Sequence, residues 1–278
     1  MKTLRQKVHA QLPNLRKADL HIHSNYSDGK PTVLEILEYV ERQTDLSVIA
    51  ITDHDTITGA LEAKELMKKQ DYRFDLVIGE EVSSIEGHIL ALYIKKPIPG
   101  GLTAHETLKL IREQDGIAIA AHPFYSSRMN FNLPSTVNGV GAKELINDKH
   151  LFNALETVNA TPLMADENFR AKYLNRLLLF RAETGSSDAH ILQAIGKGYT
   201  IFEGKSASDL REAIETNQTQ ALNDKWDLMA FSRYAFFYLP KGLRIAFQTL
   251  VFGPKRGQQD IIKFPNRFQI KKDISSDK

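Results

Sequence analysis

Two histidines and an aspartate near the amino end have the spacing expected of ligands to a divalent metal ion. His21 and His23 lie two residues apart in a short apolar run. Since the side chains of a β-strand alternate between its two faces, both imidazoles would face the same side. Five residues after His23, a Ser-Asp-Gly turn would return the carboxylate of Asp28 toward the end of that strand. Imidazole and carboxylate ligands suit a divalent-metal site, although this stretch alone also fits an ordinary strand with two hydrogen-bonded histidines.

Comparable side chains recur at the edges of other apolar runs. His54, Glu81, His122 and the pair Asp188 and His190 follow such runs, and His88 precedes one. Of the nine histidines, six lie at the edge of a predicted strand beside other potential ligands. Chance placement would scatter them, so the pattern favours a metal site assembled from several parts of the chain. We expect surface or structural roles for the other three, His9, His105 and His150.

The composition is that of an ordinary globular protein. At 278 residues, the chain is long enough to bury a large core, either as one α/β barrel or as one domain with an appendage. The absence of cysteine excludes a disulfide framework, a thiolate metal site and a cysteine nucleophile. The first residues lack the apolar segment of a signal peptide, and we therefore expect a cytoplasmic protein.

Charge is distributed unevenly along the chain. Residues 225–278 contain eleven lysines and arginines and four aspartates, whereas residues 1–224 contain 25 basic and 30 acidic side chains. A basic segment therefore follows a slightly acidic body, which makes residues 225–278 a candidate contact for anionic partners.

The elements that would position these side chains alternate between strands and helices. Strands are expected near 18–23, 47–51, 74–79, 88–94, 117–121, 154–158, 180–184 and 198–202, and helices near 57–69, 142–147, 163–179 and 206–217. Two further helices begin with capping boxes, Thr32 with Glu35 and Thr103 with Glu106. The first of them would bury Leu34, Leu37 and either Tyr39 or Val40.

This alternation predicts an α/β fold with mainly parallel strand pairing. Seven or so strand–helix units with special residues at the carboxyl ends of the strands favour a TIM-like barrel, in which the chemistry lies on the loops at that rim. A doubly wound open sheet is the competing architecture, but it would collect ligands at one switch point rather than from nearly every strand. We expect an amino-terminal arm over 1–17, the barrel over 18–222 and an aromatic and basic extension over 223–278.

Six short motifs together resemble those of the PHP (polymerase and histidinol phosphatase) superfamily. In chain order they are the two histidines with their Ser-Asp-Gly turn, Thr-Asp-His-Asp, Gly-x-Glu-Val-Ser, a following histidine, Ala-His-Pro and Ser-Asp-x-His, and they cover about 18–215. The segment Gly-x-Gly-Tyr-Thr that ends at Thr200 resembles the PHP-associated carboxyl-terminal stretch. This resemblance implies a distorted (β/α)7 barrel, in agreement with the count of elements.

The resemblance also implies a cluster of two or three divalent metal ions. One ion would be held by His21, His23, Glu81 and Asp188, a second by Glu81, His88 and His122, and a third by Asp28, His54 and His190. Glu80 is the alternative to Glu81, but the family spacing Gly-x-Glu selects Glu81. Imidazoles and carboxylates suit zinc, manganese or iron.

Such a cluster would be suited to phosphoester hydrolysis. Two metal ions about 3.5–4 Å apart can lower the pKa of a bridging water toward about 7 and hold both the attacking and the leaving oxygen. We therefore predict hydrolysis by a metal-bound hydroxide, with Asp28, His54, Glu81 and His190 as catalytic residues. Asp53 and Asp55 flank His54 and would orient neighbouring groups or cap the following helix.

Three further residues are candidate substrate contacts. Ser126 and Arg128 follow His122 closely and would hold a substrate phosphate, the arginine as a bidentate donor, with a solvated loop arginine as the alternative. Glu156, together with Asn159, ends a predicted strand and would touch the substrate or a ligand histidine, with a structural role at the rim as the alternative.

The sequence does not choose among a phosphorylated small molecule, a nucleotide and a short nucleic acid as the substrate. Only 66 positions separate His122 from Asp188, which leaves little room for the inserted cap of the nucleotide-hydrolysing branch. A histidinol-phosphatase-like enzyme and a non-catalytic, metal-binding PHP module that serves an interaction are the alternatives. An amidohydrolase-type barrel also begins with His-x-His, but it would need a lysine ligand for which the sequence has no obvious candidate.

Residues 226–252 are rich in aromatic side chains, with arginines and a lysine between them. Their apolar runs are too short for a transmembrane helix. We weigh three roles for this segment: packing on the barrel or self-association, peripheral contact with an anionic membrane, and contact with nucleic acid. Residues 255–278 are polar, and we expect them to be partly disordered.

Overall fold

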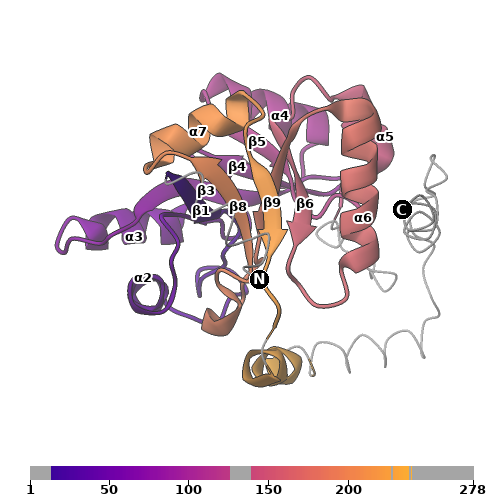
Figure 1. Ribbon diagram of the computed structural model, residues 1–278. Coiled ribbons are helices and arrows are strands. Elements are labelled where there is room, and N and C mark those ends of the chain that lie inside the picture. Colours follow the sequence, from indigo (N-terminus) through magenta and orange to yellow (C-terminus); the bar gives the residue numbers. More distant parts are fainter. Residues whose placement is uncertain (1–13, 126–138, 227, 238, 240–278) are drawn as a thin grey trace, which may run out of the picture.

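The computed structural model describes residues 14–125, 139–226, 228–237 and 239 of the chain. Within them, nine strands form one sheet in the order β7-β6-β5-β4-β3-β2-β1-β8-β9 (Figure 1). The strands are β1 (Leu15–Asp19), β2 (Val48–Ile51), β3 (Asp75–Ser83), β4 (His88–Leu92), β5 (Ile117–Ala120), β6 (Ala154–Asn159), β7 (Ala182–Ser186), β8 (Gly198–Glu203) and β9 (Gln220–Asn223). The apolar strands β2, β4 and β5 are buried at every position, as is typical of strands covered on both faces.

The sheet is mixed, with as many antiparallel as parallel strand pairs among the described residues. The runs β1-β2-β3 and β5-β6-β7 are parallel, whereas β4 is antiparallel to β3 and β5, and β8 is antiparallel to β1 and β9. The expectation of mainly parallel pairing is therefore wrong. The connection over 84–87 is too short for a crossover, so β4 returns beside β3 as a hairpin strand. The sequence pattern does not indicate β9.

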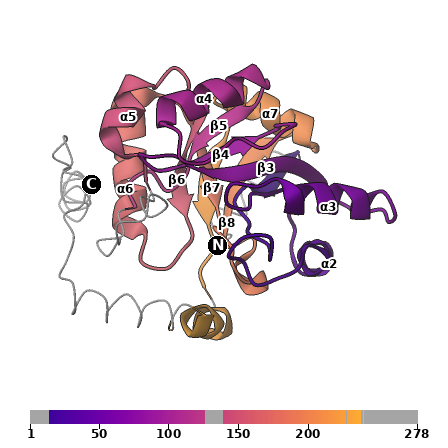
Figure 2. The same ribbon diagram turned by 180° about the vertical axis from the view of Figure 1, so that it is seen from behind.

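The sheet curls until its edge strands approach each other, which produces a nearly closed barrel (Figure 2). Where β7 meets β8, Gly185 N donates to Thr200 Oγ1 at 3.0 Å, and that hydroxyl donates to Gly185 O at 3.0 Å. A Cβ on Gly198 would lie 2.0 Å from Ser186 O, so this close approach excludes a side chain. The predicted α/β, TIM-like barrel is confirmed.

Helices cover the outside of the barrel (Figures 1 and 2). They are α2 (Val33–Gln43), α3 (Thr58–Met67), α4 (Ala104–Glu113), α5 (Gly141–Asn147), α6 (Ala165–Leu174), which continues as a π-helical stretch (Asn175–Leu179), and α7 (Ala207–Glu215). Both predicted capping boxes are present at the starts of α2 and α4. In α2, Leu37 and Val40 are buried as expected, but Leu34 is exposed because Val33 and Ile36 occupy the inner face instead.

The first strand lies further toward the amino end than the sequence pattern indicates. β1 ends at Asp19, and residues 20–23 continue beside the loop that follows β7, where Ile22 forms an isolated bridge with Ala189. His21 and His23 therefore lie just beyond the carboxyl end of β1, at the rim where barrels of this type carry their chemistry.

Part of the carboxyl-terminal extension packs on the barrel. Residues 228–237 are helical and lie below the strands in Figure 1. Trp226 Nε1 donates to Ala160 O at 2.8 Å, and the rings of Trp226 and Tyr234 meet edge to face with centroids 5.0 Å apart. In the described part of the chain, no helix has the length and apolar character needed to cross a bilayer. Self-association, membrane contact and nucleic-acid contact through 226–252 stay predictions. Residues 240–278 and 1–13 lie outside the described residues.

Candidate metal centre

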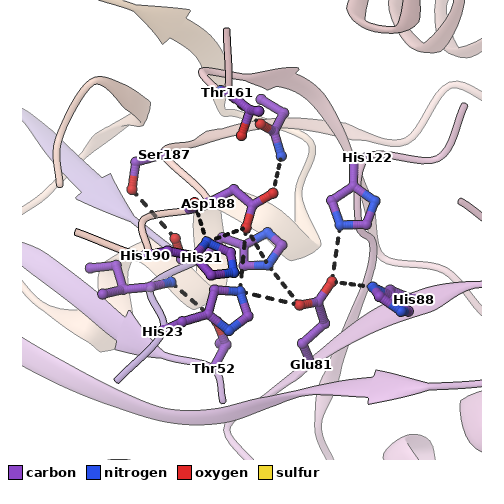
Figure 3. Close-up of polar contacts among 12 residues, drawn as sticks. His21, His23, Thr52, Glu81, His88, His122, Thr161, Ser187, Asp188 and His190 are labelled. Carbon is purple, nitrogen blue, oxygen red and sulfur yellow. Dashed lines mark hydrogen bonds and ion pairs between the residues drawn. The ribbon is translucent and has the colours of Figure 1, made fainter. Parts of the chain in front are cut away.

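Glu81 lies in the middle of a group of buried histidines (Figure 3). Its Oε1 is 2.8 Å from His88 Nδ1 and 3.0 Å from His122 Nε2. Its Oε2 is 3.1 Å from His21 Nε2 and 3.2 Å from His23 Nε2. One carboxylate on β3 therefore contacts imidazoles that come from the ends of β1, β4 and β5.

The segment after β1 directs His21 and His23 to the same side. Ala189 N donates to His21 O at 3.1 Å, and His23 N donates to Ala189 O at 2.9 Å, so the chain runs extended here. Side chains two residues apart in extended chain share a face, and the two imidazole centroids are 5.0 Å apart. The expectation that these histidines share a face is therefore confirmed, although they lie beyond the strand rather than within it.

Asp188 approaches both histidines from the loop after β7. Its Oδ1 is 3.5 Å from His21 Nε2 and 3.3 Å from His23 Nε2. The φ angles of Asp188, 53°, and His122, 26°, are positive, a region that residues other than glycine rarely adopt. Such conformations are held in place by the surrounding structure and are concentrated at functional sites.

Asp28, His54 and His190 form the outer part of the group. Asp28 Oδ1 is 2.9 Å from His190 Nε2 and 3.8 Å from both His54 Nε2 and His23 Nδ1. His54 Nδ1 is 3.3 Å from Glu81 Oε2, which joins the outer part to the inner part. The structure thus brings all nine predicted ligand residues into one continuous group, and their role as ligands stays a prediction.

Within the described residues, several imidazole nitrogens of this group are buried and have no hydrogen-bond partner. They are His21 Nε2, His23 Nε2, His54 Nδ1, His88 Nε2 and His122 Nδ1. Several lie 3.1–3.5 Å from a carboxylate oxygen but without the alignment of a hydrogen bond. Two ligand atoms about 2.1 Å from a tetrahedral zinc ion would lie about 3.4 Å apart. The spacing therefore suits shared coordination of a cation better than hydrogen bonding.

Four overlapping sets of side chains have ligand atoms close enough to share an ion. They are His23 with Asp28, His54 and His190; His21 with His122 and Asp188; His21 with His23 and Glu81; and His54 with Glu81 and His88. These sets differ in two ways from the predicted assignment of ligands to three ions. The structure also places His54 beside Glu81, and it groups His122 with His21 and Asp188. The number and identity of the ions stay predictions.

Asp53 holds the loop that carries Asp28. Its Oδ1 accepts hydrogen bonds from Ser24 N at 2.7 Å and Ser27 Oγ at 2.6 Å, and its Oδ2 accepts one from Ser24 Oγ at 2.7 Å. Asp55 accepts a backbone hydrogen bond from β3 at 2.7 Å. Since α3 begins without a side-chain cap, both aspartates orient neighbouring loops and strands, and the alternative of helix capping is wrong.

Glu156 is fully buried behind His21. Its Oε1 is 3.1 Å from His21 Nδ1, and its Oε2 accepts hydrogen bonds from His122 N at 2.6 Å and Asn159 Nδ2 at 3.0 Å. Asn159 Nδ2 also donates to Asp188 Oδ2 at 3.1 Å. The role of Glu156 as a substrate contact stays a prediction. Of the alternatives, contact with a histidine of the group is the one observed, and such a partner fixes the orientation of the ring.

Of the two adjacent glutamates on β3, Glu81 is the one that reaches the histidines. Glu80 points to the opposite side, where its Oε1 accepts a hydrogen bond from Ile98 N at 2.5 Å. Burial raises the pKa of the Glu80 carboxyl to about 7. Alternation along the strand thus separates the two side chains, as the sequence predicts.

Burial and neighbouring charges act in opposite directions within the group. Burial lowers the pKa of His23, but the nearby carboxylates of Asp188 and Glu81 outweigh this effect and raise that pKa to about 10. Burial raises the pKa of Glu81, yet the surrounding histidines hold it well below its usual range. Burial prevails at His54 and lowers its pKa to about 4. The carboxylates therefore supply negative charge, and a bound cation would compete with protons for the histidines.

A cavity of 660 Å³ opens onto this group. Beyond the candidate ligands, Tyr125 and Thr161 line it from the chain between β5 and α6, and Glu167 lines it from the first turn of α6. Phe231 and Tyr234 line it from the helix over 228–237. This volume suits a small organic ligand. No sequence motif indicates these five residues, because they reach the cavity only through the packing of the loops and the extension.

Some predicted residues cannot be placed at this site. Ser126 and Arg128, the predicted phosphate contacts, lie outside the described residues, and their role stays a prediction. His105 Nδ1 is 2.6 Å from Asp148 Oδ1, and His150 is exposed, in agreement with the surface or structural roles expected of them. His9 also lies outside the described residues.

Comparison with known proteins shows where the chain has relatives. Residues 166–219 match the model of a family described as PHP-associated. An uncharacterized protein of Methanocaldococcus jannaschii is 42% identical over 118 residues, which cover 39% of this chain and 68% of that protein. A 5'-3' exoribonuclease of Haemophilus influenzae is 25% identical over 205 residues, which cover 72% of this chain and 64% of the exoribonuclease.

A solved structure has a similar fold. A two-domain protein from Bacteroides vulgatus, described as containing a predicted PHP-like metal-dependent phosphoesterase, aligns with a TM-score of 0.59 at 18% identity. The alignment covers 75% of this chain and 65% of that protein. At this level of identity, the likeness concerns the fold.

Proposed function

The chain belongs to the PHP superfamily of metal-dependent phosphoesterase-like proteins, and we propose that it hydrolyses phosphoesters with divalent metal ions held by its buried histidines and carboxylates. The observation that carries this proposal is that five histidines around Glu81 each have a buried ring nitrogen with no hydrogen-bond partner in the part of the chain that the structure describes. Leaving buried polar atoms without a partner costs free energy, and a bound cation would remove that cost.

The proposed ligands are the residues that converge at the barrel rim. They are His21, His23, Asp28, His54, Glu81, His88, His122, Asp188 and His190. We propose two or three ions of zinc, manganese or iron, all of which accept imidazole and carboxylate ligands. When bound, such ions supply Lewis-acid activation of the phosphoryl group and of a water molecule.

Within this group we propose Asp28, His54, Glu81 and His190 as the catalytic residues. Glu81 is buried between the histidines and keeps a fixed negative charge at their centre. Asp28, His54 and His190 line the cavity, where a substrate phosphate would enter. His190 Nε2 lies 2.9 Å from Asp28 Oδ1, so the two groups would act together at the cavity wall.

The proposed substrates are phosphomonoesters, nucleotides or short nucleic acids. The cavity volume of 660 Å³ supports a substrate portion of small-molecule size. The similarity to the exoribonuclease, which extends over 72% of this chain, supports nucleic acid as a substrate. An interaction module that binds metal without catalysis is the second candidate.

The test combines metal analysis with hydrolysis assays on the purified full chain. The protein is stripped by chelation, reloaded with manganese, zinc or iron, and assayed on p-nitrophenyl phosphate, nucleoside monophosphates, histidinol phosphate and short RNA. We expect hydrolysis that requires metal and that falls to background in Glu81→Gln and in His23→Ala. His150→Ala, an exposed histidine outside the group, is the matched control and should retain both metal content and rate.

The possible outcomes separate the candidates. Stoichiometric metal without hydrolysis of any phosphoester would favour the non-catalytic module. Hydrolysis confined to histidinol phosphate would favour the histidinol-phosphatase-like alternative. Failure to bind any of the three metals would remove the proposed function altogether.

A further inference from the structure

Two residues that line the cavity, outside the candidate ligand group, each have a buried polar atom with no hydrogen-bond partner among the described residues. The atoms are Thr161 Oγ1 and Glu167 Oε2, and both residues line the cavity of 660 Å³. A buried polar atom without a partner is destabilising, and in a native structure it commonly marks a position that another molecule completes. Because the cavity also opens onto Asp28 and His122, a ligand that fills it from the candidate centre would lie beside Thr161 and Glu167.

Hydrogen bonds fix the backbone segments that carry the two residues. Thr161 N donates to Asn159 Oδ1 at 2.9 Å, and Asn159 Nδ2 donates to Asp188 Oδ2 at 3.1 Å, which places Thr161 near Asp188 (Figure 3). Asn168 Nδ2 donates to Asn159 O at 2.8 Å, and Asn159 N donates to Asn168 Oδ1 at 3.0 Å. These bonds join the first turn of α6, which carries Glu167, to the end of β6.

We infer that Thr161 and Glu167 form a subsite for the leaving group of the substrate, and that this group carries hydroxyls that donate hydrogen bonds to Glu167. The inference rests on the proposed phosphoesterase activity. A carboxylate oxygen accepts hydrogen bonds, so the ligand atom that faces it must donate. A second phosphate or a carboxylate on the leaving group would be repelled by Glu167.

The rest of the wall fits the carbon skeleton of such a leaving group. Tyr125, Phe231 and Tyr234 line the same cavity, and aromatic side chains of this kind provide apolar contact area. Glu167 also lies in the first turn of α6, where a carboxylate complements the helix dipole. That interaction does not require Oε2 to be buried without a partner. The substrate class is therefore a phosphomonoester of a polyol or sugar, without a second anionic group near Glu167.

The test compares two esters that differ in hydroxyl groups. Hydrolysis of glycerol 1-phosphate and of n-propyl phosphate releases a primary alcohol in both cases. Only the glycerol group has further hydroxyls that can donate hydrogen bonds to Glu167. With the metal-loaded full chain, we expect kcat/KM to be about 10- to 100-fold higher for glycerol 1-phosphate. The ratio should fall toward one in Glu167→Met and in Thr161→Val, which remove the polar oxygens but keep a side chain of similar size.

Asp166→Asn is the matched control. It changes the neighbouring exposed carboxylate in the same turn of α6, outside the residues that line the cavity, and should leave the ratio unchanged. Equal kcat/KM for the two esters, or an unchanged ratio in Glu167→Met, would overturn the subsite while the phosphoesterase activity stands. If the metal-loaded protein hydrolyses no phosphoester of either panel, the proposed function fails and the subsite fails with it.

Discussion

The carboxylate of Asp19 accepts a hydrogen bond from Ser187 N at 3.0 Å, across 168 positions of the chain. Its second oxygen accepts one from Gly196 N at 2.8 Å, and the side chain is fully buried. Burial, opposed by these hydrogen bonds, raises the pKa of this carboxyl to about 6. Asp19 thus ties the end of β1, just before His21, to the loop that carries Asp188. No sequence motif indicates this role of Asp19, and its only signal is an acidic residue two positions before His21.

Removing this carboxylate should destabilise the barrel. In Asp19→Ala, the N–H groups of Ser187 and Gly196 lose their acceptor, and we expect the free energy of unfolding to fall by about 2–4 kcal/mol. Urea unfolding measures this change. Asp45→Ala is the control, because Asp45 is exposed and pairs with Lys17 at the surface, and its loss should stay within about 1 kcal/mol. Comparable losses in the two variants would contradict the role assigned to Asp19.

The place where β7 meets β8 should tolerate no side chain. An alanine Cβ at position 198 would lie 2.0 Å from Ser186 O and 3.0 Å from Ala160 Cβ. Gly198→Ala should therefore lower the free energy of unfolding by about 3 kcal/mol or more. In Gly101→Ala, no atom lies within 4 Å of the new Cβ, and only the φ of 78° opposes the substitution, so we expect a loss of about 1–2 kcal/mol. Thermal and urea unfolding of both variants measure these losses. Equal losses in the two variants would show that replacing a glycine, rather than the contact with Ser186, causes the destabilisation.

Glu156 should influence metal affinity without being a ligand. Its Oε1 lies 3.1 Å from His21 Nδ1, and loss of such a partner lowers metal affinity by about 10- to 100-fold. We expect this weakening in Glu156→Gln, measured by titration in competition with a chelator. Glu183→Gln is the control. Glu183 is not part of the candidate centre, and its Oε1 accepts a hydrogen bond from Arg176 Nε at 2.6 Å. This variant should bind metal with the affinity of the unmodified chain. An unchanged affinity in Glu156→Gln would show that the ring of His21 needs no such support.

Chelation should lower thermal stability, because the proposed ions would bind the folded chain and not the unfolded one. At a free metal concentration 100 times Kd, a single ion contributes about 2.7 kcal/mol. We expect the Tm to fall when a chelator is added and to recover when metal is restored. In Glu81→Gln, which lacks the central carboxylate, the Tm should respond much less. If the chelator leaves the Tm of the unmodified chain unchanged, this result would argue against metal at this site.

Local patterns account for the parts of the fold that the sequence predicts well. The capping boxes at Thr32 and Thr103 are present because each involves residues only three positions apart. Glu80 and Glu81 separate to opposite sides because alternation is a property of the strand itself. The direction in which β4 pairs and the exposure of Leu34 depend on neighbouring elements, and here the sequence-based expectations are wrong.

The amino-acid sequence by itself determined the chemistry available to this protein: imidazoles and carboxylates at the edges of apolar runs, no thiol, and a strand–helix alternation that must close around a core. The tertiary structure alone decided which of these groups meet. It set Glu156 behind His21, joined Asp19 to Ser187, and lined the cavity with Thr161, Glu167 and the helix over 228–237. The physical reason is that residue type and local period are properties of neighbouring positions, whereas contact across the barrel depends on how separate segments pack together.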